Sequence, residues 1–188
     1  EVSFTKLKEA LKGKAALVIG PGFTPSEEVR RLIEMVVKDI KIPLLIDGGA
    51  LSSLEGRGSI LKRSKVPVVL TPHPGEAARL LGSSPTEIQA DRIASAERLV
   101  KATGAIVVLK GAGTVVAAPG GVFINPTGNP ALSTAGTGDV LAGLIGGLLA
   151  QGYSALDSAV SGVYIHGLAA DILREKGRDK GMIATDLL

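Results

Sequence analysis

The residues best suited to chemistry lie in one glycine-rich run, residues 129–143, which reads NPALSTAGTGDVLAG. Its glycines lead into an apolar segment that reads as a helix, so a flexible loop directly precedes a helix N-terminus. Free backbone N–H groups and the positive end of the helix dipole make such a junction an anion site. Asp139 lies at this junction. Its carboxylate could complement the dipole, or it could act as a general base toward a hydroxyl that attacks phosphorus.

Four other candidate segments follow aliphatic runs that read as buried strands. Ligands bind beyond the carboxyl ends of the strands in an open parallel sheet. Glycine and proline at these ends hold the backbone close and fixed, so that N–H groups can face a ligand. One such segment would be an ordinary tight turn, but four on one edge favour a ligand site. The segments are Gly20-Pro21-Gly22, Asp47-Gly48-Gly49, residues 71–76 (TPHPGE) and residues 110–114 (KGAGT).

Several enzyme classes are not supported because their motifs are missing. The Walker pattern GxxxxGK[ST] is absent, and the dinucleotide fingerprint GxGxxG fails because Pro25 stands where the third glycine belongs. The absence of cysteine excludes disulfides, zinc–thiolate sites and a catalytic thiol. No Ser–His nucleophile system is recognisable either. These observations are compatible with phosphoryl transfer, which needs positioning and electrostatic stabilisation more than a covalent nucleophile.

The elements that must position these residues alternate along the chain between strand and helix. This alternation predicts an α/β fold in which a mostly parallel central sheet is flanked by helices on both faces. A β-hairpin of residues 114–118 and 122–125 is expected before the glycine-rich run, and the whole chain, residues 1–188, reads as one domain. The expected strands are residues 15–19, 43–47, 66–70 and 105–109.

The expected helices have recognisable ends. Thr24, Pro25 and Glu27 read as the N-cap, the first helical residue and the N3 residue of a helix that ends near Asp39. A long helix over residues 86–103 should stop at Gly104, a natural left-handed cap. Further helical segments are expected over residues 4–11, up to Leu81, over 140–151 and over 156–175.

Composition narrows the class of partner. The net charge is +3, from 21 basic and 18 acidic residues, and only 3% of residues are aromatic. This pattern argues against nucleic-acid binding and suits a small polyanion such as a nucleotide. The most apolar stretch, residues 140–150, is too short and glycine-rich to span a membrane, and no signal peptide is recognisable. We therefore expect a soluble, cytoplasmic protein without membrane or nucleic-acid partners.

Taken together, the motifs resemble those of one family, the ADP- or ATP-dependent NAD(P)H-hydrate dehydratases of the ribokinase-like superfamily. The order and spacing of the motifs match over nearly the whole chain, and the run from Gly136 to Gly143 resembles the superfamily's anion-hole signature. Family members are often fused to an epimerase domain. The segments that carry the resemblance are Gly20–Gly22, Leu70–Glu76, Val108–Gly111, Asn129–Gly143 and Gly162–Gly167.

The resemblance implies a role for each candidate residue. His73 and Asp139 would contact the hydrated dihydronicotinamide, with Asp139 activating its ring hydroxyl, and Gly20 and Gly22 would line the substrate cleft. The adenine nucleotide would be held by Lys110, Gly111, Ala112, Gly113, Thr114 and Gly138. The anion hole would consist of Ala135, Gly136, Thr137 and Gly138.

The resemblance also implies a reaction. ATP or ADP phosphorylates the ring hydroxyl of hydrated NADH or NADPH, and phosphate then departs to restore NADH or NADPH. The reaction depends on Mg²⁺, which phosphate oxygens and water would mainly hold, so no residue of this chain is expected to form a metal cage. Family members form homo-oligomers, commonly tetramers or larger.

Three departures from the family pattern stand out. Gly49 replaces a second acidic residue that often follows the second strand, and Thr24 stands where the family usually has a further glycine. Family domains normally begin with further strands and helices ahead of Phe4, so this chain is expected to lack an N-terminal part of the fold. Two other functions stay open at this point: a ribokinase-like kinase for a thiazole, pyrimidine or sugar alcohol, and a nucleotide-binding subunit without catalysis.

Four polar residues need an interpretation of their own. We expect His166 to be structural, because it lies among apolar residues of a helix, and Asp171 to be a solvated or capping carboxylate. Glu76 opens a helix, where a carboxylate complements the dipole. His73 lies between two prolines at a strand end, which favours a functional role.

Overall fold

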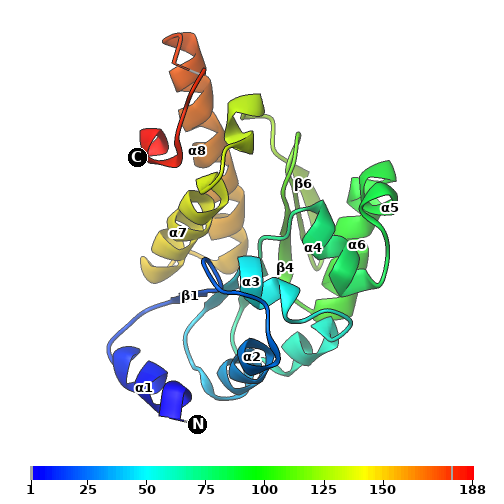
Figure 1. Cartoon of the computed structure of the whole chain (residues 1–188), viewed down its shortest axis with the longest axis vertical. Coiled ribbons are helices and arrows are strands. Elements are labelled where there is room, and N and C mark those ends of the chain that lie inside the picture. The colour runs from blue at the N-terminus through cyan, green and yellow to red at the C-terminus, as the bar shows by residue number, and fades with distance from the viewer. Residues whose placement is uncertain (1, 179) are drawn as a thin grey trace.

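A six-stranded sheet organises the molecule (Figure 1). The computed structural model describes residues 2–178 and 180–188. The strands lie side by side in chain order: β1 to β4 are parallel, β5 is antiparallel to β4, and β6 is antiparallel to β5. They are β1 (Leu17–Ile19), β2 (Leu44–Ile46), β3 (Val68–Leu70), β4 (Ile106–Leu109), β5 (Val115–Ala118) and β6 (Gly121–Ile124).

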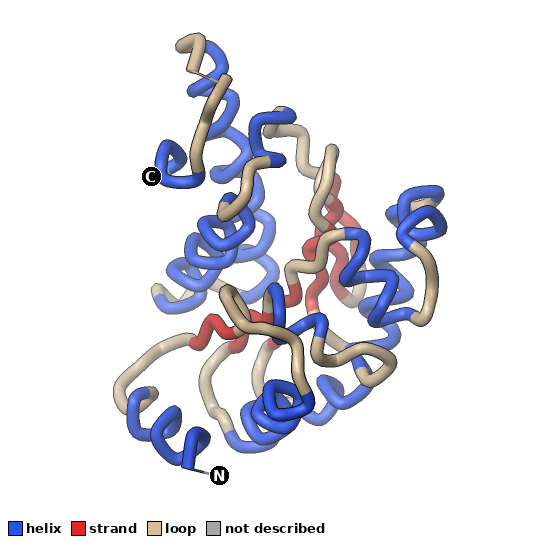
Figure 2. Tube along the Cα trace, in the orientation of Figure 1, coloured by secondary structure: helices blue, strands red, loops and turns tan. Residues whose placement is uncertain are grey.

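Helices cover both faces of this sheet, as the alternation of elements predicts (Figure 2). The described α-helices are α1 (Val2–Ala10), α2 (Glu27–Asp39), α3 (Gly48–Ser52), α4 (Pro74–Leu81), α5 (Pro85–Ala90), α6 (Arg92–Thr103), α7 (Thr137–Ala150) and α8 (Ala155–Glu175). Short 3₁₀ segments are η1 (Gly58–Arg63), η2 (Pro130–Ser133) and η3 (Ala184–Leu187). Among the described residues, no helix has the length and apolarity that a membrane crossing requires.

Strands β1 to β5 are aliphatic because successive side chains enter two different cores. Leu44 and Ile46 of β2 pack with α2, α4 and α6, whereas Leu45 packs against α7 and α8. All three β2 residues are fully buried. A strand covered on both sides has no solvent-facing position, which is why the strands read as continuous apolar runs.

The start of α2 and the helix predicted over residues 86–103 differ from the sequence prediction. The N-cap of α2 is Ser26, not Thr24: the Ser26 Oγ accepts a hydrogen bond from Val29 N, so Pro25 precedes the helix instead of opening it. The predicted helix over residues 86–103 is interrupted at Asp91, whose backbone is extended and whose side chain accepts from Ala94 N to cap α6. Aspartate competes with a continuing helix in this way because its carboxylate can satisfy free N–H groups.

Helix α7 begins at Thr137, three residues before the predicted start at Val140. Gly136 precedes it with a left-handed φ of 86°. Asp139 is therefore the third residue of the helix, within its first turn; its N–H donates to Gly136 O at 3.1 Å, and the N–H of Thr137 donates to Thr134 O at 3.3 Å. Helix α8 crosses directly over α7, and the contact is close because Gly162 has no side chain: a Cβ there would lie 2.5 Å from Ile145 Cγ1.

We therefore expect Gly162→Ala to destabilise the fold by about 1–3 kcal/mol, because the added methyl group overpacks the α7–α8 contact. Gly147→Ala is the matched control, since Gly147 also lies inside a helix but nothing comes within 4 Å of its added Cβ. That variant should be neutral or more stable by about 0.5–1 kcal/mol, as alanine favours helix over glycine. Urea unfolding measures both values, and equal effects would contradict the packing account.

Candidate active site

The carboxyl ends of the parallel strands place the candidate segments along one edge of the sheet. The backbone ladder continues past the strands: Asp47 N donates to Ile19 O, Thr71 N to Ile46 O and Lys110 N to Pro72 O, at 3.1, 3.4 and 2.9 Å. The residues after β1, β2, β3 and β4 thus lie next to one another in that order. A ligand at this edge would meet all four segments.

The first two turns interlock through glycines. An added Cβ at Gly20, whose φ is 119°, would overlap the Asp47 carbonyl oxygen, and one at Gly49 would overlap the Phe23 carbonyl oxygen. Gly49, which stands where the family often has an acidic residue, is therefore required by the close approach of the 20–23 turn in this structure. Gly22 is exposed on the outer side of that turn.

Lys110 joins three elements at the centre of this edge. Its Nζ lies 2.9 Å from Asp47 Oδ1 and 3.4 Å from the position of a Cβ on Gly138. Its ammonium is therefore held between the end of β2 and the first turn of α7. The Asp47 side chain is almost completely buried, while that of Lys110 is 21% exposed.

The loop that enters α7 is held by its own polar groups. The Thr137 hydroxyl donates to Leu132 O or Thr134 O, which lie 2.7 and 2.8 Å away. Asp139 is exposed at the surface of the first turn, so its carboxylate faces solvent beside the anion site. This is the arrangement in which it can both complement the dipole and accept a proton from a ligand.

His166 and Asp171 of α8 support this loop from behind. His166 is buried and its Nε2 lies 2.9 Å from Thr137 O, so Nε2 must carry the hydrogen that it donates. Burial lowers the pKa of His166, and the nearby Lys110 charge acts in the same direction. Asp171 accepts from Gly128 N at 2.7 Å and from Asn129 Nδ2 at 3.0 Å. The contacts agree with a structural role for His166, whereas Asp171 is not the solvated or capping carboxylate that we expected: it joins α8 to the loop before η2.

His73 has a structural task that the sequence analysis missed. It is the N-cap of α4: Nδ1 accepts from Gly75 N and Glu76 N at 3.0 and 3.3 Å, while the Glu76 carboxylate accepts from His73 N at 2.8 Å. Histidine is outside the usual set of capping residues, although Pro74 at the first helical position and Glu76 at N3 follow the pattern of a capped helix start. The Glu76 carboxylate is buried at the helix start, as expected. Half of the His73 side chain is exposed, which leaves the imidazole able to meet a ligand.

Arg92 is a second residue that sequence reasoning missed. Its Nη2 donates to Leu109 O at 2.9 Å, and its guanidinium fills the space that a side chain at Gly111 would need. Burial lowers the Arg92 pKa from its ordinary value. Gly111 and Gly113 have φ of 142° and 59°, so only glycine fits this loop easily. Arginine in the first turn of a helix is unfavourable for the helix dipole, so its presence there would have drawn attention to Arg92. The sequence did not show this, because the helix was predicted to continue across Asp91.

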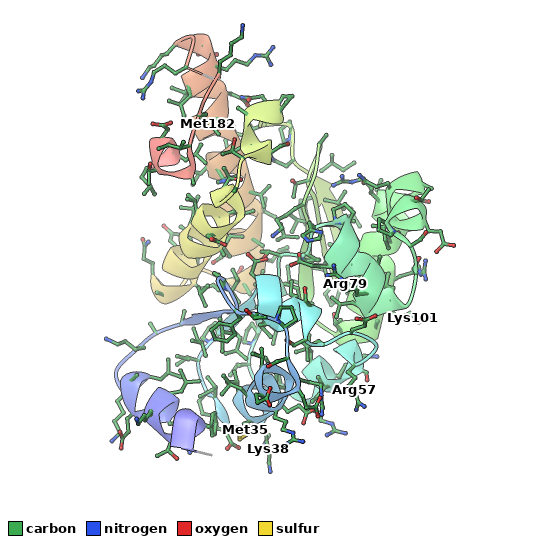
Figure 3. The ribbon with its side chains drawn as sticks, in the orientation of Figure 1. Met35, Lys38, Arg57, Arg79, Lys101 and Met182 are labelled. Carbon is green, nitrogen blue, oxygen red and sulfur yellow. The ribbon has the colours of Figure 1, made fainter. Side chains whose placement is uncertain are left out.

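Other candidate residues lie at the same edge without a recorded contact to Lys110. Ala112 is exposed, and the Thr114 hydroxyl donates to Gly111 O at 3.0 Å. Ala135 is exposed in the loop before α7. Within the described residues, no three His, Asp or Glu side chains form a group suited to a metal ion. A broad hollow lies beside α2, with Met35, Lys38 and Arg57 in its lining (Figure 3), and it extends to Gly22, one of the candidate substrate-cleft residues.

The sheet order and the two-sided helix cover are those of a ribokinase-like α/β fold. A ribokinase-like superfamily protein from Enterococcus faecalis V583 superposes on it with a TM-score of 0.79 at 29% identity, over 97% of this chain and 63% of that one. The family model described as NAD(P)H-hydrate dehydratase matches residues 2–188, and the chain belongs to this family.

Two relatives show how far the similarity extends. The bifunctional NAD(P)H-hydrate repair enzyme Nnr of Escherichia coli K12 is 44% identical over 188 residues, all of this chain but 36% of the relative. The ADP/ATP-dependent NAD(P)H-hydrate dehydratase of Bacillus subtilis, co-crystallised with ATP/Mg²⁺, is 34% identical with a TM-score of 0.83. The alignment covers 92% of this chain and 61% of the B. subtilis chain. The chain thus spans about a third and about six tenths, respectively, of these relatives' lengths.

Because His166 is buried with a lowered pKa, we expect it to make stability depend on pH. As pH falls through about 6.5, the ordinary histidine value, the unfolded chain binds a proton that the folded chain resists, so the free energy of unfolding falls. His166→Gln keeps a donor for Thr137 O but does not titrate. Urea unfolding between pH 7.5 and 5.5 should give a shallower slope for the variant. His73 is present in both proteins, so it does not contribute to the difference between them. Parallel plots of unfolding free energy against pH would contradict the role given to His166.

Proposed function

We propose that this chain forms the catalytic unit of an ADP- or ATP-dependent dehydratase that restores NADH or NADPH from its hydrated form. The observation that carries the proposal is the position of the Lys110 ammonium against Gly138, with exposed Asp139 next along the helix. A cation, a helix N-terminus and a solvent-facing carboxylate then meet at one place. Family membership supports the reaction type.

The nucleotide would lie along the edge formed by β4 and α7. Its phosphates would meet the N–H groups around Gly136 and Gly138 and the positive end of the α7 dipole. Lys110 would add a point charge at the same position, while the open loop of residues 111–114 would receive the rest of the nucleotide. The left-handed glycines of that loop allow its backbone to approach a ligand closely.

The hydrated dihydronicotinamide would lie beside the turns that follow β1 and β3, near Gly20, Gly22 and His73. Asp139 would accept the proton of the ring hydroxyl as the hydroxyl oxygen forms a bond to the terminal phosphorus of the nucleotide. The bond from that phosphorus to the rest of the nucleotide breaks in the same step. The phosphate ester is a better leaving group than hydroxide. Its departure, with loss of the neighbouring ring proton, would restore the double bond of the dihydronicotinamide.

Magnesium fits this site as an ion bound mainly by the nucleotide. The Asp47 carboxylate is paired with Lys110 and the Glu76 carboxylate caps α4, which leaves Asp139 as the exposed carboxylate at the α7 junction. Phosphate oxygens and water therefore would supply most ligands, as Mg²⁺ prefers. When bound, Mg²⁺ would neutralise charge that develops on the phosphates. Assembly into a homo-oligomer, a tetramer or larger, stays a prediction.

The first test replaces the proposed base. Asp139→Asn should lower kcat by about 10²–10⁴-fold, because the amide cannot accept the proton, while nucleotide affinity changes little. The assay supplies hydrated NADH with ATP or ADP and follows the return of dihydronicotinamide absorbance. Asp157→Asn is a matched control, since Asp157 is also a first-turn aspartate, in α8. Full activity of Asp139→Asn, or accumulation of phosphorylated small alcohols instead, would contradict the proposal.

A second test separates the two tasks of His73. Asparagine is among the best N-cap residues, so His73→Asn should change the free energy of unfolding by less than about 1 kcal/mol. If the exposed imidazole contacts the substrate, losing one hydrogen bond should raise the KM for hydrated NADH by about tenfold. Steady-state kinetics and urea unfolding measure the two effects. An unchanged KM would reduce His73 to its capping role.

A further inference from the structure

We infer that Asp47 is a positioning residue for phosphoryl transfer, which acts by holding the Lys110 ammonium over the first turn of α7. The inference rests on the proposed function, because it assigns Lys110 to the phosphate that reacts. Asp47 itself would touch neither the nucleotide nor the substrate. Its carboxylate is buried behind Lys110, which is the more exposed partner.

The orientation of the Asp47 side chain is the first argument. Asp47 occupies the N-cap position of α3, where aspartate normally accepts a hydrogen bond from the helix. Here its side chain makes no capping hydrogen bond and lies 2.9 Å from Lys110 Nζ instead. The carboxylate thus does not cap α3 but pairs with a residue 63 positions away along the chain. This choice indicates that the ion pair, and not the helix start, determines its position.

The surroundings of the ion pair are the second argument. Thr71 lies between the two residues at the end of β3, and its fully buried hydroxyl has no recorded hydrogen-bond partner in the described part of the chain. Buried polar groups without a partner are uncommon and need an explanation. Three polar side chains therefore follow the ends of β2, β3 and β4 near the start of α7. Asp47 and Lys110 bond each other, and the Thr71 hydroxyl is left without a hydrogen-bond partner among the described residues.

The charge balance of the ion pair shows how Asp47 could affect the reaction. An ammonium has three N–H donors, and Asp47 uses one, so the others remain for a phosphate. The Asp47 charge also offsets that of Lys110, so it cannot strengthen phosphate binding by attraction. Its contribution is to fix a long, flexible side chain in one place. Removing the carboxylate should thus harm the reaction more than it harms nucleotide binding.

The experiment is a double-mutant cycle on the purified protein with Asp47→Asn, Lys110→Met and both together. We expect Asp47→Asn to lower kcat at least tenfold while the Kd for ATP or ADP stays within about threefold or becomes tighter. Lys110→Met should weaken nucleotide binding as well. It should also lower Tm, by on the order of 10 °C, because it leaves the Asp47 carboxylate buried and unpaired.

The double variant separates positioning from stability. Asp47→Asn should restore most of the Tm that Lys110→Met loses, because no unpaired charge then remains, but it should restore none of the turnover. If the ion pair were merely structural, the double variant would regain Tm and turnover together. Arg30 and Glu34 of α2 provide the control pair, since they form an ion pair away from the site. Glu34→Gln should leave kcat and nucleotide Kd unchanged.

Two failures are distinguishable. Wild-type kcat in a folded Asp47→Asn variant, or a loss of nucleotide affinity as large as its loss of kcat, overturns the positioning role while the proposed function stands. A wild-type protein that binds nucleotide but never restores dihydronicotinamide overturns the proposed function, and this inference with it.

Discussion

The two-sided cover of the parallel sheet is the constraint on which the rest of the structure depends. Because helices bury both faces, a strand such as β2 cannot place a polar side chain on either face without burying it. Polar side chains of the sheet can therefore reach a ligand only where the strands end. Asp47, Thr71 and Lys110 each follow the last residue of a buried strand, and the ladder of backbone hydrogen bonds sets them side by side. The site is thus a consequence of how the core is built.

The candidate anion site at α7 is supported from behind by α8. His166 bonds the carbonyl of Thr137, and Asp171 bonds Gly128 N and Asn129, so the start of the glycine-rich run and its entry into α7 are both anchored to one helix. Gly162 allows α8 to approach α7 closely enough for these contacts. A loop that binds phosphates by its backbone must keep its N–H groups in place before the ligand arrives. The glycines give the loop its shape, and α8 holds that shape.

The sequence predicted what depends on local pattern and failed where distant residues decide. The strands, the hairpin and the stop at Gly104 follow from aliphatic runs and turn residues, and the structure confirms them. The break at Asp91 was missed because a helical pattern continues across it. The cap by His73 depends on an imidazole nitrogen that happens to face two N–H groups. The pairing of Asp47 with Lys110 spans 63 residues, so no local pattern could show it.

Two aspartates of the candidate site differ in environment, and this difference suits them to the different tasks that we propose for them. Asp47 is buried and paired with an ammonium, so it cannot approach a ligand directly. Asp139 is exposed in the first turn of α7, close to where the phosphates would lie. A base must be accessible, whereas a positioning group must be rigid. Under the proposed mechanism the fold meets both needs: one carboxylate pairs with Lys110 and the other follows Gly138, so that the cation would lie between the residue that fixes it and the residue that accepts the proton.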